Sequence, residues 1–315
     1  MIHTERKYIE ILRILKEHSE PMGAKRLSEL MAERGFVLSD RAVQYYLRYL
    51  DEMGFTRKVG NQGRVLTPYG HQETENALVG DRVGFIISKL ERLAYRSTFN
   101  PETSTGDVAY NLSIVPEERL GEATAAFDEV IAARCGFFSR YRIVDSDPRI
   151  PKGRVGILSI CSITMDGVFQ REGIPVRMAY GGRLAIQHEE ATHFVDLIGY
   201  RGTTIDPLQL FISSGLTSLS SLVRTGSGIA LANVREIPAV AESRARETVA
   251  RMKRAGFVFP VALGSSVFNL VLDPYRLAIV AYSGMNFVAN AYEKGIPIKT
   301  EIGAGTIPFS RFLGE

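Results

Sequence analysis

Four side chains with hydrogen-bonding chemistry recur at helical spacing near the start of the chain. They are Arg41, Gln44, Tyr45 and Arg48, at positions i, i+3, i+4 and i+7. This spacing places all four on one face of an α-helix. Arginine can pair bidentately with guanine, glutamine can pair with adenine, and tyrosine can contact a phosphate or sugar. The pattern therefore predicts a recognition helix that enters the major groove of duplex DNA.

Three amphipathic helices are expected to hold this face in place. The first covers residues 5–18, and the second carries Leu27, Leu30 and Met31 on one face. The third begins after Ser39, a favourable N-cap residue, and ends at Gly54. Its apolar face consists of Val43, Tyr46, Leu47 and Leu50. These helices predict a helix-turn-helix, with Ser39 and the polar stripe at the DNA.

A β-hairpin is expected directly after the third helix. Residues 55–59 and 64–67 have the composition of strands, and a Gly-Asn-Gln-Gly turn joins them. Such a hairpin forms the wing of a winged helix, and its basic residues can bind the phosphate backbone. These residues are Arg57, Lys58 and Arg64. The alternative is a protein-interaction module in which the polar stripe is a solvated face.

The charge distribution agrees with an anionic partner for this region. Residues 1–70 contain 12 Lys and Arg against 9 Asp and Glu, whereas the rest of the chain contains 26 of each. No apolar run reaches the roughly 18–20 residues that span a bilayer, and residues 1–7 do not resemble a signal peptide. We therefore expect a cytoplasmic protein. The cysteines, Cys135 and Cys161, are too few for a disulfide framework or a thiolate zinc site.

A second group of reactive side chains follows an apolar β-branched segment at residues 155–160. Cys161, Ser162 and Thr164 place a thiol and two hydroxyls at the expected start of a helix, which favours anion binding. No Cys/His arrangement that would activate the thiol is recognisable. His188 and His193 are five residues apart, so one helix would not present both to a metal ion. We expect no catalytic residues, no metal site and no cofactor.

An internal repeat with an offset of 122 residues organises the remainder of the chain. The segment Gly173–Arg177 (GIPVR) matches Gly295–Lys299 (GIPIK), and Gly181 matches Gly303. The halves, about 105–182 and 225–310, each read as strand, helix, strand, strand, helix, strand. The predicted fold class is α/β (α+β), with two facing halves and a cleft between them for a small ligand.

Glycine-rich segments close to the end of each half are expected to be loops and are candidates for binding that ligand. They are Tyr180-Gly181-Gly182-Arg183 and residues 302–306, where backbone amides can approach a ligand closely. Arg183 can pair with a carboxylate. Asn286, in the second-half counterpart of the Cys161 segment, is a further candidate. The alternative for the glycines is a structural role in tight turns.

These features divide the chain into three parts. Residues 1–70 are the predicted winged helix-turn-helix, residues 71–100 a linker helix, and residues 101–315 a ligand-sensing domain. A single winged helix reads only a few base pairs, so we expect a homodimer on an inverted-repeat operator.

The combined pattern resembles the NrpR family of nitrogen-responsive repressors, with a winged helix of the ribonuclease R type. The resemblance extends over nearly the whole chain. The motifs that carry it are Thr105-Gly106-Asp107 with Asn111, Cys161–Gly167, Gly173-Ile174-Pro175, Tyr180-Gly181-Gly182, Gly202–Pro207 and Arg235-Glu236-Ile237-Pro238.

The resemblance implies a dimeric repressor of nitrogen-assimilation genes that leaves its operator when 2-oxoglutarate binds. The chain contains one regulatory domain, whereas some members of the family have two in tandem. Two other functions stay open: an enzyme that converts a small acid, and an RNA-binding accessory factor. The candidate effector-binding residues are Cys161, Ser162, Thr164, Tyr180, Gly181, Gly182, Arg183 and Asn286.

Overall fold

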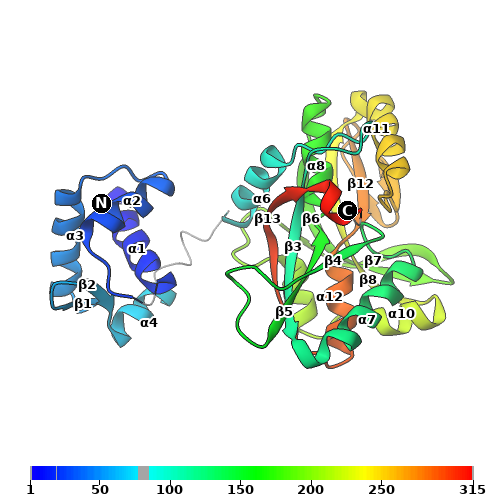
Figure 1. Ribbon diagram of the computed structural model, residues 1–315. Helices are drawn as coiled ribbons and strands as arrows, with labels where there is room; N and C mark the ends of the chain where they lie inside the picture. Colours follow the sequence, from blue (N-terminus) through cyan, green and yellow to red (C-terminus); the bar gives the residue numbers. More distant parts are fainter. Residues whose placement is uncertain (1, 19, 77–84, 314–315) are drawn as a thin grey trace. The chain divides into compact units, whose positions relative to one another are not determined.

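The protein consists of two compact units, residues 1–83 and 84–315 (Figure 1). The computed structural model describes residues 2–18, 20–76 and 85–313. Within these residues, no helix has both the length and the apolar character needed to cross a membrane.

The first unit has the helices and the hairpin that the sequence predicts. Its elements are α1 (Ile2–Glu17), α2 (Ala24–Glu33), α3 (Asp40–Glu52), β1 (Thr56–Val59), β2 (Gly63–Leu66) and α4 (Pro68–Asn76). Ser39 caps α3, because its Oγ accepts a hydrogen bond from the Ala42 amide at 3.3 Å. The apolar faces of α1, α2 and α3 meet in one core around Ile11, Leu27 and Leu47.

The wing is anchored to the segment before α2. Met22 and Arg64 exchange backbone hydrogen bonds of 3.0 Å in both directions. Gly63 has φ +130°, and a Cβ there would lie 2.2 Å from the Met22 carbonyl carbon. Only glycine permits this close approach of the two backbones.

The second unit confirms the repeat and the order of its elements. The first half contains β3 (Asp107–Pro116), α7 (Leu120–Ala132), β4 (Tyr141–Val144), β5 (Arg154–Ile160), α8 (Ile163–Arg171) and β6 (Arg177–Gln187). The second contains β8 (Gly228–Pro238), α11 (Glu242–Arg254), β9 (Ala262–Gly264), β12 (Arg276–Tyr282), α12 (Met285–Glu293) and β13 (Lys299–Pro308). Between β9 and β12 lies a short hairpin of β10 (Ser266–Val267) and β11 (Leu270–Val271).

The two halves are interlocked through their last strands, and this arrangement differs from the two facing halves expected from the sequence. Strand β6 of the first half pairs with β8, and β13 of the second half pairs with β3. The result is a four-stranded sheet ordered β13-β3-β5-β4 and a five-stranded sheet ordered β7-β6-β8-β12-β9. Sequence periodicity specifies that a segment is a strand, but not which strand it pairs with.

The segment that connects the halves adds one strand and two short helices. They are β7 (Glu190–Gly199), α9 (Pro207–Ser213) and α10 (Leu219–Thr225). Asp206 caps α9, because its carboxylate accepts a hydrogen bond from the Leu208 amide at 2.9 Å. Three short 3₁₀ turns lie at residues 117–119, 239–241 and 309–312.

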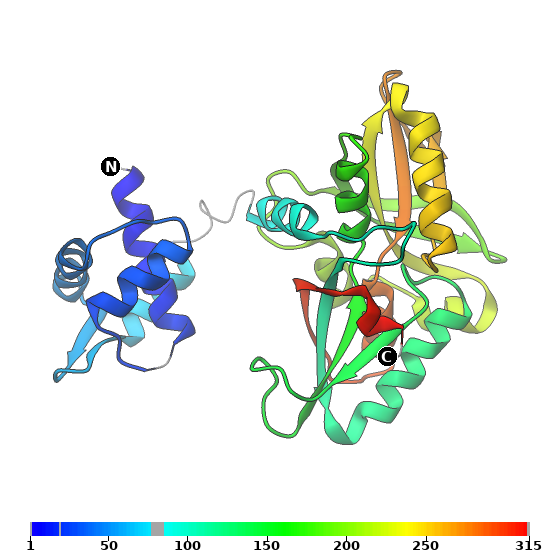
Figure 2. The same ribbon diagram turned by 45° about the horizontal axis from the view of Figure 1, so that its top comes forward.

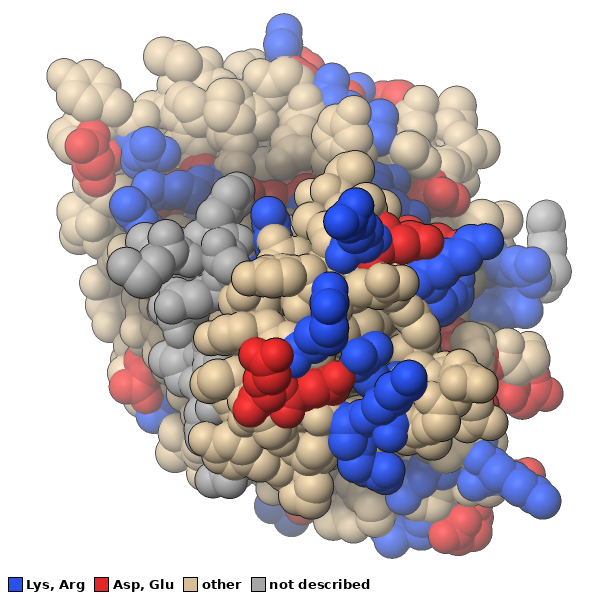
Figure 3. Space-filling model, turned by 90° about the vertical axis from the view of Figure 1, so that its left-hand side faces the viewer, with Lys and Arg blue, Asp and Glu red and all other residues tan. Residues whose placement is uncertain are grey.

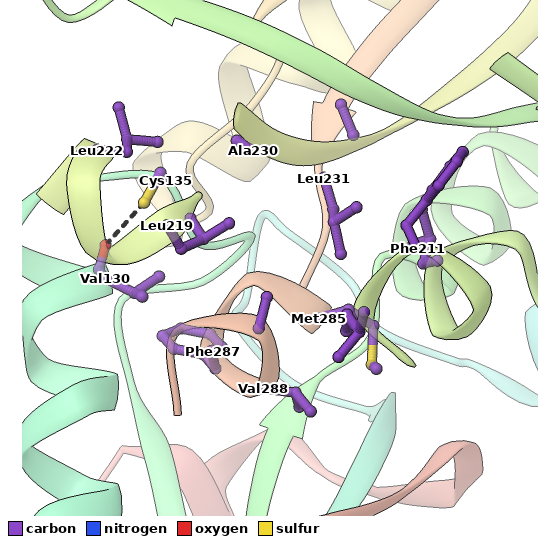
Figure 4. Close-up of a cluster of buried hydrophobic side chains, with 14 of the residues drawn as sticks. Val130, Cys135, Phe211, Leu219, Leu222, Ala230, Leu231, Met285, Phe287 and Val288 are labelled. Atoms are coloured by element: carbon purple, nitrogen blue, oxygen red, sulfur yellow. Dashed lines mark hydrogen bonds between the residues drawn. The ribbon is translucent and has the colours of Figure 1, made fainter. Parts of the chain in front are cut away.

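Most of the core of the second unit lies in two large apolar clusters, and both sheets contribute to each cluster. Figure 4 shows part of the first cluster, where Phe287 and Val288 of α12 lie near Leu219 and Leu231. Cys135 belongs to this cluster, and its Sγ lies 3.7 Å from the Val130 carbonyl oxygen. The other cluster includes residues of α8 and α11, and α11 lies beside β12 in both ribbon views (Figures 1 and 2).

The expected linker helix, residues 71–100, contains the end of one helix and the whole of another. Helix α4 ends at Asn76, and α6 (Phe85–Arg96) begins after residues 77–84, which lie outside the described residues. Helix α6 belongs to the second unit and packs on α8 and β13. Its Lys89 Nζ donates to the Ile302 carbonyl at 2.7 Å, and Leu93 lies where a side chain on Gly303 would be.

Candidate functional site

The polar stripe of α3 is exposed on the surface of the first unit. Arg41, Gln44, Tyr45 and Arg48 are all exposed, whereas Val43, Leu47 and Leu50 on the opposite face are buried. Figure 3 faces the side of the unit with α3 and the wing, and Lys and Arg side chains gather there around a group of acidic ones. This surface has the shape and charge of a winged-helix DNA interface.

The basic residues of this surface differ in whether they form an ion pair with another side chain. No described residue forms an ion pair with Arg41, Arg48, Arg57 or Lys58, so all four are free to bind an anion. The Nε of Arg64, in contrast, donates to Asp51 Oδ2 at 2.7 Å. Arg64 therefore ties the wing to α3 through this ion pair, and its contact with phosphate stays a prediction.

A buried arginine lies in the middle of the second unit, on β8. Arg235 has 0 % of its surface exposed and is among the largest fully buried side chains of the described residues. Its Nε donates to Asp166 Oδ1 at 2.9 Å, and its Nη2 donates to Ser162 Oγ at 2.9 Å. Its Nη1 has no hydrogen-bond partner among the described residues. A buried donor without a partner is costly, so Nη1 requires an acceptor from outside the described residues, either a water molecule or a ligand.

Other polar side chains extend this site into a buried network. Asn233 Nδ2 donates to Ser162 Oγ at 3.2 Å, and the Tyr200 hydroxyl donates to Asn233 Oδ1 at 3.1 Å. The same hydroxyl lies 3.4 Å from Asp206 Oδ2. We call Ser162, Asp166, Tyr200, Asp206, Asn233 and Arg235 the buried polar cluster. It joins α8, β8 and the segment before α9.

Burial changes the pKa values of ionisable groups in the cluster and beside it. Burial raises the pKa of the Asp166 carboxyl, and the positive charge of Arg235 opposes that rise. Cys161 is adjacent in sequence and buried, and burial raises the pKa of its thiol to about 11. The thiol is therefore protonated at neutral pH, and a protonated thiol is a poor nucleophile.

A small groove borders the cluster at Asp166. Its volume is about 180 Å³, and Asp166 of α8 forms part of its wall. Leu90 and Glu91 of α6 and Met178 of β6 also line it. A ligand in this groove would contact α6 and Asp166, the ion-pair partner of Arg235.

The structure places the predicted effector residues in different environments. Cys161 and Ser162 lie at the buried polar cluster. Thr164 Oγ1 instead accepts from the Ala109 amide at 3.0 Å, and Asn286 Oδ1 accepts from the Leu231 amide at 2.8 Å. Because both side chains brace neighbouring strands, neither is free to bind a ligand in this arrangement.

The segment Tyr180–Arg183 is a strand, which corrects the expectation of a ligand-binding loop. Residues 180–183 lie inside β6, where β7 and β8 pair with the strand on both sides. Gly181 and Gly182 permit close packing, since a Cβ on Gly181 would lie 2.9 Å from Pro207 Cβ. Arg183 Nε donates to Asp196 Oδ2 at 2.7 Å, so this cation already has a carboxylate partner. Residues 302–306 lie likewise inside β13.

Most of the buried polar cluster was not predicted from the sequence, although the residues of β8 contain one signal of a polar site. Asn233 and Arg235 follow directly on the apolar residues 229–232. Asparagine and arginine are rarely fully buried unless other groups pair with them. Their spacing of two residues puts them on the same face of the strand, which could have indicated a polar site.

The carboxyl of Asp206 makes stability depend on pH. Burial raises its pKa to about 6, whereas the ordinary value in an unfolded chain is about 3.9. Between these pH values the folded chain binds more protons, so stability falls as the pH rises, by up to about 3 kcal/mol in total. Hydrogen bonds from the Leu208 and Gln209 amides oppose the rise of the pKa most, followed by the Tyr200 hydrogen bond and the charge of Lys89.

Asp206→Asn tests this dependence, because asparagine also caps helices and does not titrate. We expect the free energy of unfolding, measured with urea from pH 4 to pH 7, to fall more steeply with rising pH in the parent than in the variant. The same pH profile for both proteins would contradict a raised pKa at Asp206.

Comparisons with known sequences identify both units. The ribonuclease R winged-helix domain matches residues 9–74, and the NrpR regulatory domains NRD1 and 2 match residues 83–313. The chain belongs to the NrpR family. The winged helix and the regulatory domain together indicate a DNA-binding transcriptional regulator.

Relatives of this NrpR-family chain are named as nitrogen regulators. Global nitrogen regulator NrpRI of Methanosarcina mazei is 37% identical over 302 residues, which cover 94% of each protein. Global nitrogen regulator NrpR of Methanococcus maripaludis is 30% identical, over 91% of this chain and 51% of that protein. The crystal structure of a nitrogen repressor-like protein from Methanococcus jannaschii superposes with a TM-score of 0.62 and 25% identity. It covers 71% of this chain and 96% of the other.

Proposed function

We propose that this NrpR-family protein is a cytoplasmic, homodimeric repressor of nitrogen-assimilation genes, and that 2-oxoglutarate releases it from DNA. The observation that carries the effector part is Arg235 Nη1, a buried cationic donor without a partner among the described residues. The observation that supports the DNA part is the exposed face of α3, with Arg41 and Arg48 unpaired.

The chemistry of the buried polar cluster suits a carboxylate ligand. An arginine binds a carboxylate through two parallel hydrogen bonds, and such charge-assisted bonds are stronger than neutral ones. In this structure, Asp166 accepts the hydrogen bond from Arg235 Nε. A ligand carboxylate would bind Nη1, with Ser162 and Asn233 as neighbouring hydroxyl and amide groups. Cys161 would border this site as a neutral thiol.

Helix α6 provides a route from this site towards DNA binding. It lines the groove that borders the cluster at Asp166, and its first residue follows the segment 77–84 after the winged helix. A ligand shifts an equilibrium only if it binds one conformation better than the other. We propose that 2-oxoglutarate favours an arrangement in which α6 has moved off α8, and that this arrangement binds the operator less well.

A binding titration tests the proposal. The full-length protein is titrated against a labelled duplex from its own upstream region, with and without millimolar 2-oxoglutarate. We expect specific binding to weaken roughly 5- to 150-fold, the usual range for coupling between two sites. 2-Oxobutyrate, which has one carboxylate, serves as the control and should have little effect. If specific binding does not change with 2-oxoglutarate, the proposal that 2-oxoglutarate is the effector is contradicted. If the protein binds random DNA equally well, the proposal of a sequence-specific operator is contradicted.

A further inference from the structure

The two sheets contain equivalent positions that differ by one carboxylate. In the five-stranded sheet, Arg177 lies opposite Glu236, and Arg276 lies opposite Pro238. Glu236 is buried and sits between the two cations. Its Oε2 is 2.5 Å from Arg177 Nη2 and 3.7 Å from Arg276 Nη1. The two arginines therefore share this one carboxylate.

The four-stranded sheet repeats this geometry without the carboxylate. Lys299 lies opposite Ile114, and Arg154 lies opposite Pro116, in the same registers. The offset of 122 residues makes Ile114 the counterpart of Glu236. Both Arg154 and Lys299 are exposed, and neither forms an ion pair with any described residue. In one half, two cations share a carboxylate. The equivalent two cations of the other half have the aliphatic side chain of Ile114 in its place.

These two cations border a groove with an apolar floor. The groove has a volume of about 530 Å³, and its lining includes Ile114, Ile296, Ile298 and Tyr292. That volume is within the usual range of small-molecule sites, about 300–1,000 Å³. Arg149 also borders the groove, but Asp147 already pairs with it.

We propose that this groove is a second ligand site, for a small carboxylate that carries an aliphatic or aromatic body. The carboxylate binds between Arg154 and Lys299, where the repeat places the Glu236 carboxylate in the other half. The apolar body lies on Ile296 and Ile298 beside the ring of Tyr292, which is 45% exposed. This site is separate from the buried polar cluster, and its existence does not depend on the identity of the effector.

Calorimetric titration of the full-length protein with 4-phenylbutyrate tests the site. We expect saturable binding that weakens at least about tenfold in the double variant Arg154→Gln/Lys299→Gln, because two charge-assisted contacts are lost. Ile114→Glu is expected to weaken binding similarly, since the new carboxylate pairs with both cations as Glu236 does. The double variant changes only exposed residues and so should fold normally.

Two controls make the result specific. Arg276→Gln alters the matching cation of the other half and should leave binding unchanged. The uncharged 4-phenylbutan-1-ol should bind more weakly than 4-phenylbutyrate to the parent, and equally to the parent and the double variant. The proposal is overturned if 4-phenylbutyrate shows no saturable binding. It is also overturned if the double variant and Ile114→Glu both bind like the parent.

Discussion

Arg235→Met is expected to destabilise the second unit by about 3–5 kcal/mol and to abolish the response of DNA binding to 2-oxoglutarate. Arg235 is the cationic partner of Asp166, whose side chain is only 8% exposed. Removal of one partner leaves the other charge buried and unpaired, which costs about that much. The same change removes the donor that we propose for the effector carboxylate. Urea unfolding measures the first effect, and DNA titration with the effector measures the second.

A second variant separates the stability of this unit from its ligand chemistry. In Arg235→Met/Asp166→Leu both charges are absent, so we expect stability to recover to near that of the parent. The response to 2-oxoglutarate should stay absent, because no cation replaces Arg235. Arg246→Met is a matched control, since Arg246 pairs with Glu242 at the surface and should contribute under about 1 kcal/mol. A double variant that is stable and still responds would refute Arg235 as the effector site.

Arg41→Ala and Arg48→Ala are each expected to lower the affinity for the operator by about 5- to 150-fold. Both side chains are exposed on the face of α3 that is predicted to meet the bases, and no described residue pairs with them. A bidentate contact with a base contributes about 1–3 kcal/mol of discrimination, which corresponds to this range. Fluorescence anisotropy with operator and scrambled duplexes measures the affinity and the specificity ratio.

The wing provides a contrast to the recognition helix. Lys58→Ala is expected to weaken binding to operator and scrambled DNA equally and to lower the salt dependence by about one phosphate contact. Arg119→Ala, in the second unit, removes a cation that pairs with Glu122 and should change neither quantity. If Arg41→Ala and Arg48→Ala reduced binding to both duplexes equally, α3 would contact only the backbone of the DNA.

In the first unit, the sequence predicts which basic residues lie on an outer face, but not which of them form ion pairs. The helical period placed Arg41 and Arg48 on the outer face of α3, because that period depends only on local geometry. The expected hairpin placed Arg64 among the DNA-binding candidates as well, although Asp51 pairs with it. Residue type alone does not reveal an ion pair between a helix and a strand, since that pair forms only when the hairpin packs.

In the second unit, the sequence by itself determined the elements and the repeat. Hydrophobic periodicity and turn residues are local signals, so the order strand, helix, strand, strand, helix, strand could be predicted in both halves. The matching segments at 173–177 and 295–299 were enough to align those halves. The sequence also placed Cys161 and Ser162 before a helix, where the structure has them.

Only the tertiary structure decided how the halves combine and where the candidate ligand sites lie. The exchange of β6 and β13 depends on strand pairing between distant segments, which a period of two residues does not specify. That exchange places Lys299 beside Ile114. Asp166 and Arg235, 69 residues apart, meet through packing of α8 on β8. Local residue patterns determine which elements form, whereas the burial of their faces against one another determines which side chains become partners.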